Sequence, residues 1–76
     1  MTGRPQKHSL TLKGHRTSVS LEPEFWQRFR EIARAKQVPI NELAAEIDEG
    51  RGIERGLASA IRVFVLSYYT DQIEAR

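Results

Sequence analysis

The sequence predicts a mainly α-helical protein with a short β-ribbon at its N-terminus. Residues 16–21 read Arg-Thr-Ser-Val-Ser-Leu, an alternation that is typical of a half-buried strand. From Pro23 onwards the apolar residues recur at helical spacing instead, and residues 57–69 are apolar almost all round. The chain has 76 residues, enough for one domain. At this size, association of subunits commonly supplies missing burial.

The strand over residues 16–21 has two chemically different faces, because its side chains alternate with a period of two. One face consists of Thr17, Val19 and Leu21. The other is small, polar and positively charged at one end, and consists of Arg16, Ser18 and Ser20. So short a strand is not stable alone, and nothing later in the chain reads as a strand. We therefore expect it to pair with its copy in a second subunit, as a two-stranded ribbon that fits the DNA major groove.

A second alternating run begins at Ser9, and its apolar residues are out of phase with those of residues 16–21. The phase resets at Gly14 and His15, which predicts a hairpin with a two-residue turn there. The expected cross-strand pairs are Leu12 with Thr17 and Leu10 with Val19. The polar face of this hairpin collects Thr11, Lys13, Arg16 and Ser18. One long strand with a bulge is the alternative.

Positive charge is concentrated at the N-terminal end of the chain. Residues 1–21 hold four Lys or Arg and no acid, whereas residues 22–76 hold eight Lys or Arg against ten Asp or Glu. Lys and Arg contacts to phosphates supply the sequence-independent part of DNA affinity. We expect residues 1–8 to form a flexible basic arm and residues 9–76 to form the domain.

Two amphipathic helices are predicted after the strand. The first begins near Pro23, a residue suited to the first helical position. Its core stripe consists of Phe25, Phe29 and Ile32. Trp26 lies one position off that stripe and is expected at a subunit interface. The second helix begins near Pro39, and its apolar face consists of Ile40, Leu43, Ala44 and Ile47.

A third helix is expected from about Glu54, after a loop predicted by the acids and glycines of residues 48–52. A helix that is apolar on every side is buried on every side, and one subunit of this size cannot surround it. The sequence therefore predicts an intertwined dimer. The expected dimer core consists of Val19, Leu21, Phe25, Phe29, Leu57, Ile61 and Phe64.

The composition argues against several function classes. The chain has no cysteine, so it forms neither a disulfide nor a thiolate metal site, and the reducing cytoplasm is the expected location. His8 and His15 have no acid near them in sequence, so neither a general base nor a metal ligand is expected there. No apolar run reaches the roughly 18 residues of a membrane span. The sequence thus predicts neither an enzyme nor a cofactor or metal site.

The order of strand, helix opening after Glu22 and Pro23, short turn and second helix resembles the ribbon-helix-helix family of bacterial DNA-binding regulators. The resemblance covers roughly residues 16–47, and the third helix makes the chain look like a variant with an added C-terminal helix. In that family, strands from two subunits pair antiparallel and their outward side chains read base edges in the major groove. The resemblance implies a transcription regulator that binds double-stranded DNA as a homodimer.

The resemblance also implies roles for individual residues. The base-reading positions match Arg16, Ser18 and Ser20, and an Arg side chain can hold guanine O6 and N7 with two hydrogen bonds. Arg16 is therefore expected to supply most of the direct discrimination between bases.

Phosphate contacts are expected from two places. The start of the second helix matches the phosphate-binding element of the family and places Ile40 and Asn41 there, although Pro39 stands where a Ser or Thr cap is usual. Lys13, beside the turn, is expected to contact phosphates only and no bases. The alternative function is a dimerisation or adaptor module without strong DNA affinity, which the acidic helical part favours.

Overall fold

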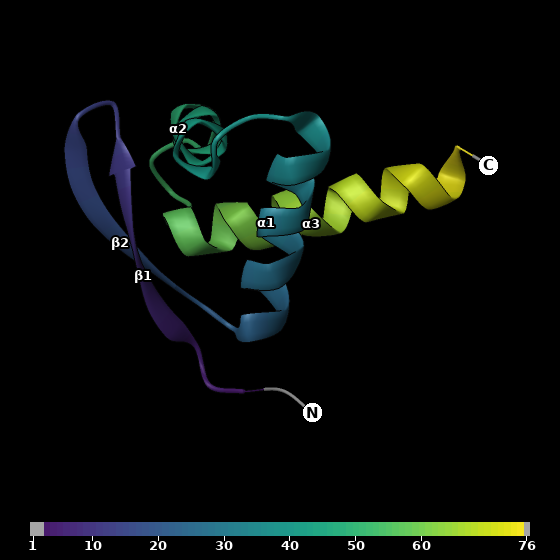
Figure 1. Cartoon of the computed structure of the whole chain (residues 1–76), viewed down its shortest axis with the longest axis horizontal. Helices are drawn as coiled ribbons and strands as arrows, with labels where there is room; N and C mark the ends of the chain where they lie inside the picture. The colour runs from purple at the N-terminus through teal and green to yellow at the C-terminus, as the bar shows by residue number, and fades with distance from the viewer. Residues whose placement is uncertain (1–2, 76) are drawn as a thin grey trace.

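The computed structural model describes residues 3–75 and has an N-terminal β-hairpin followed by three helices (Figure 1). Its elements are β1 (Gln6–Leu12), β2 (His15–Leu21), α1 (Pro23–Lys36), α2 (Ile40–Gly50) and α3 (Leu57–Glu74). The expected fold class, mainly α with a short N-terminal ribbon, is confirmed. Of the expected arm, residues 1–2 lie outside the described residues, and β1 already begins at Gln6.

The ribbon is an antiparallel hairpin within one chain, so β2 pairs with β1 rather than only with another subunit. The predicted register is wrong. The two turn residues are Lys13 and Gly14, one position earlier than expected, and Leu12 therefore lies opposite His15 while Leu10 lies opposite Thr17. Both turn residues have positive φ, 51° and 84°, which suits the right-handed twist of a two-residue hairpin.

The first two helices begin and end where local signals place them. Pro23 opens α1, where its missing N–H has no partner to lose. The helix ends because Gln37 adopts a left-handed conformation, with its N–H bonded to Arg34 O and that of Val38 bonded to Ala33 O. Two residues later Pro39 precedes α2, so only a short connection separates the first two helices.

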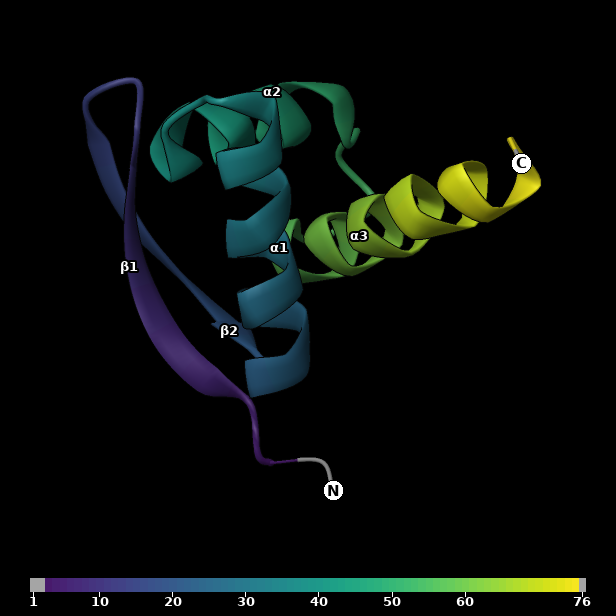
Figure 2. The same ribbon diagram turned by 45° about the vertical axis from the view of Figure 1, so that its right-hand side comes forward.

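The loop between α2 and α3 is closed by one side chain. Arg51 donates from Nε to Asp48 Oδ1 (2.6 Å) and from Nη1 to the carbonyl oxygen of Arg55 (2.6 Å). The third helix starts at Leu57, three residues after the expected position. From there α3 crosses behind α1 in the view of Figure 2 and packs against it.

The hydrophobic core lies between the inner face of the ribbon and the three helices. Its largest fully buried side chains are Phe29, Leu21, Ile32, Leu43 and Ile61. Four of the seven residues expected in a dimer core, namely Val19, Leu21, Phe29 and Ile61, are thus buried within one chain. The other three, Phe25, Leu57 and Phe64, are half-buried.

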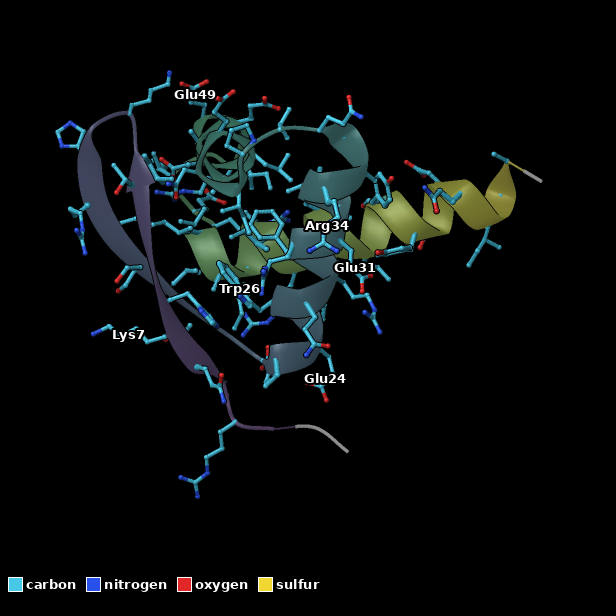
Figure 3. All side chains as sticks on the ribbon, viewed as in Figure 1. Lys7, Glu24, Trp26, Glu31, Arg34 and Glu49 are labelled. Atoms are coloured by element: carbon cyan, nitrogen blue, oxygen red, sulfur yellow. The ribbon has the colours of Figure 1, made fainter. Side chains whose placement is uncertain are left out.

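One chain does not cover α3 on every side, so the expected burial on all sides is not reached within a single chain. Ala60, Ile61 and Val65 face the core, but Leu66 keeps 64% of its surface exposed and Val63 keeps 41%. Trp26, which we expected at a subunit interface, instead stacks on His8 of β1 with ring centroids 3.9 Å apart. Figure 3 shows its indole between α1 and the ribbon.

Candidate nucleic-acid interface

The outward face of the ribbon carries three cross-strand pairs of exposed polar side chains. The pairs are Lys7 with Ser20, Ser9 with Ser18 and Thr11 with Arg16. The opposite face holds the buried Leu10, Leu12, Val19 and Leu21. The predicted burial of Val19 and Leu21 is confirmed, whereas Thr17 on the same face of β2 is exposed. The structure brings Arg16, Ser18 and Ser20 together in one exposed row. No acid belongs to this face.

The far edge of β2 is open, because the sheet formed by residues 3–75 has only two strands. In an antiparallel hairpin with a two-residue turn, hydrogen-bonded and non-hydrogen-bonded pairs alternate, starting with a bonded pair at the turn. The three outward-facing pairs are therefore the non-hydrogen-bonded ones. The Thr11 N–H agrees, since it points out of the ribbon and donates to Asn41 Oδ1 (3.1 Å). By the same alternation, the backbone groups of Arg16, Ser18 and Ser20 point to the open edge.

Lys13 lies in the turn and not on the outward face, which corrects its predicted place. Its ammonium forms an ion pair with Glu49 near the end of α2, and both side chains are more than half exposed. Figure 3 shows Glu49 next to the tip of the hairpin. The pair fastens the turn to α2, so a phosphate has to compete with Glu49 for Lys13.

The start of α2 lies against the outer edge of β1 through the bond between Thr11 and Asn41. Ile40 and Asn41 occupy its first turn, where backbone N–H groups lack intrahelical acceptors. The surroundings are acidic, however. Glu42 is in the same turn, and it lines a hollow together with Glu46 and Glu49. These carboxylates oppose the attraction of the helix N-terminus for a phosphate.

An ion pair between Arg62 of α3 and Glu22 holds the end of β2 in place. Arg62 of α3 donates to Glu22 Oε1 from Nε (2.9 Å), and its guanidinium lies 5.8 Å from the centre of the Phe25 ring. The hydrogen bond from Arg62 is the main reason why the pKa of Glu22 is lowered from 4.5. The charged form of Glu22 is thereby stabilised at the point where the ribbon enters α1.

The sequence reading missed Lys7 and Ser9 as members of the outward face. The correct hairpin register identifies both residues, because it places Lys7 opposite Ser20 and Ser9 opposite Ser18. His8 and His15 lie at different ends of β1–β2, and within residues 3–75 no three metal-binding side chains gather at one point. No helix of that region is both long enough and apolar enough to cross a bilayer.

Comparison with known protein families identifies a match over most of the chain. A family model described as a ribbon-helix-helix domain matches residues 5–69, which include both strands, α1, α2 and most of α3. No curated protein and no solved structure matches the chain.

Proposed function

Because the chain belongs to the ribbon-helix-helix family, whose members are generally DNA-binding transcription regulators, we propose that it is a homodimeric regulator that binds specific DNA sequences. The observation that carries this proposal is the outward face of the ribbon. Arg16, Ser18 and Ser20 stand exposed in one row, on a rigid hairpin whose other face is anchored in the core. A ribbon of this shape fits the major groove, and Arg16 has the geometry to bind guanine.

The open edge of β2 supports the dimer. We propose that two β2 strands pair antiparallel about a two-fold axis with Ser18 opposite its copy, which sets Arg16 opposite the partner subunit's Ser20 and keeps the two arginines apart. The pairing would use backbone groups that the hairpin leaves free. It would also bring in α3, which packs beside β2. The exposed apolar hollow there is lined by Phe25, Arg62, Val63, Val65, Leu66 and Tyr69.

Phosphate contacts from Lys13, Ile40 and Asn41 remain part of the proposal. Lys13 would exchange Glu49 for phosphate, at the cost of an exposed ion pair of about 0.2–1 kcal/mol. The backbone N–H groups of Ile40 and Asn41 would bind a DNA phosphate at the edge of the protein–DNA interface.

The test is selection of a preferred duplex from a random library, followed by binding of the Arg16→Ala variant. We expect this variant to bind the selected duplex about 5- to 150-fold more weakly, corresponding to roughly 1–3 kcal/mol, and to relax the preference at one base pair per half-site. Arg34→Ala, on an exposed turn of α1, is the matched control and should keep the preference. If the wild-type protein selects no sequence while remaining dimeric, the adaptor function takes its place.

A further inference from the structure

We propose that β1 is a phosphate-binding strand, in which Lys7, Ser9 and Thr11 contact the DNA backbones that border the groove read by β2. The inference rests on the proposed DNA-binding function and extends it to a strand that has no role in that proposal so far. Its starting point is that the outward side chains of β1 stand directly beside those of β2, at the three non-hydrogen-bonded pairs.

The position of β1 follows from strand spacing. Neighbouring strands lie about 4.8 Å apart, so with two β2 strands paired at the two-fold axis, each β1 lies about 7 Å from that axis. The major groove is about 12 Å wide, which puts each wall about 6 Å from its centre. The β2 strands therefore fill the groove, and the β1 strands lie over its walls, where the phosphates are.

The chemistry of β1 fits that position. Its outward side chains are one cation and two hydroxyls, the groups that commonly bind phosphate oxygens. Lys7 is exposed, forms none of the ion pairs found in residues 3–75, and points away from the helices in Figure 3. In contrast, Lys13 is paired with Glu49, and the start of α2 has acidic neighbours. Lys7 can thus meet a phosphate without giving up a partner, and among the outward side chains of β1 it is the one that carries a positive charge.

The test compares Lys7→Ala with Lys36→Ala on the selected duplex and on a shuffled duplex, at several salt concentrations. Lys36 is also an exposed lysine, but it lines a hollow formed by helix and loop residues without any part of the ribbon. If a dimer loses two phosphate contacts, the slope of log K against log salt flattens by roughly 1.8. Between 50 and 200 mM salt, Lys7→Ala should then lose roughly 12-fold less affinity than the wild type, on both duplexes. Lys36→Ala should keep the wild-type slope.

Two results would overturn the inference while leaving DNA binding itself intact. One is a Lys7→Ala slope equal to that of Lys36→Ala, with the wild type still binding the selected duplex. The other is a changed base preference in Ser9→Ala or Thr11→Val, which would mean that β1 reads bases inside the groove. If the wild type binds no duplex at any salt concentration, the proposed function fails, and the role of β1 fails with it.

Discussion

Arg62 is the residue through which α3 acts on the end of the ribbon. Its guanidinium joins Glu22, just after β2, to the ring of Phe25 in the first turn of α1. Its stem packs in the same apolar hollow that is proposed to meet the partner. One side chain therefore links the end of β2 to α3, a helix that the sequence resemblance treated as an addition but that the family model includes as far as residue 69.

Replacing Arg62 by Met should raise the pKa of Glu22 towards 4.5, because the hydrogen bond from the guanidinium is the largest cause of its lowering. A carboxyl whose folded pKa lies below its unfolded value stabilises the fold above the unfolded pKa, and that contribution is lost as pH falls through the folded pKa. Arg62→Met should therefore be less stable than the wild type at pH 7, and the difference should shrink as the pH falls below about 4.5. An NMR titration of the Glu22 carboxyl checks the pKa, and denaturation measured at pH 7 and again at acidic pH checks the stability difference. An unchanged Glu22 titration would contradict it, and Arg34→Met serves as the control.

At the scale of elements, the sequence was sufficient where signals are local. Proline fixes the starts of α1 and α2, and one strand alone decides which of its side chains alternate outwards, so the row of Arg16, Ser18 and Ser20 was predictable. The turn was not, because Lys13 adopts a positive φ that is uncommon outside glycine and no Asn-Gly signal marks it. The ion pair of Lys13 with Glu49 joins residues that are distant in sequence, and only the folded packing reveals it.

The open edge of β2 gives a matched pair of proline variants. Ser18 and Ser9 lie opposite each other in one non-hydrogen-bonded pair, so the N–H of each points away from the other strand. Proline at either place removes no bond of the hairpin, as at other edge strands. Ser18→Pro should block pairing between β2 strands and give a folded monomer, whereas Ser9→Pro should stay dimeric. Sedimentation and circular dichroism distinguish these outcomes. A dimeric Ser18→Pro variant would place the interface elsewhere.

For the whole molecule, the surface that a second subunit would have to cover is smaller than the sequence suggested. The hairpin and most of the expected dimer core are complete in one chain. Within residues 3–75 the edge of β2 is unpaired, and the apolar surface of α3 around Leu66 is exposed. The proposed interface therefore joins two preformed surfaces and does not require the chains to be threaded through each other.

Leu66→Gln should weaken this association without unfolding the chain, because the side chain is 64% exposed in a single protomer. The melting temperature of the wild type should rise with protein concentration, as for any fold stabilised by its own association. In Leu66→Gln that dependence should be weaker. Ile53→Gln is the control, since Ile53 is 99% exposed in the loop before α3. Equal behaviour of the two variants would remove α3 from the interface.

The two-residue turn at Lys13 and Gly14 also decides when the ribbon comes into being during synthesis. A hairpin between adjacent segments closes in about 1–10 μs, without waiting for a second molecule. A ribbon assembled from one strand of each subunit would instead appear only on encounter, at a rate set by concentration. In this chain each copy completes its own hairpin, including the outward face that is proposed to meet DNA. In the proposed dimer, the concentration of the protein then sets only how often two completed hairpins meet.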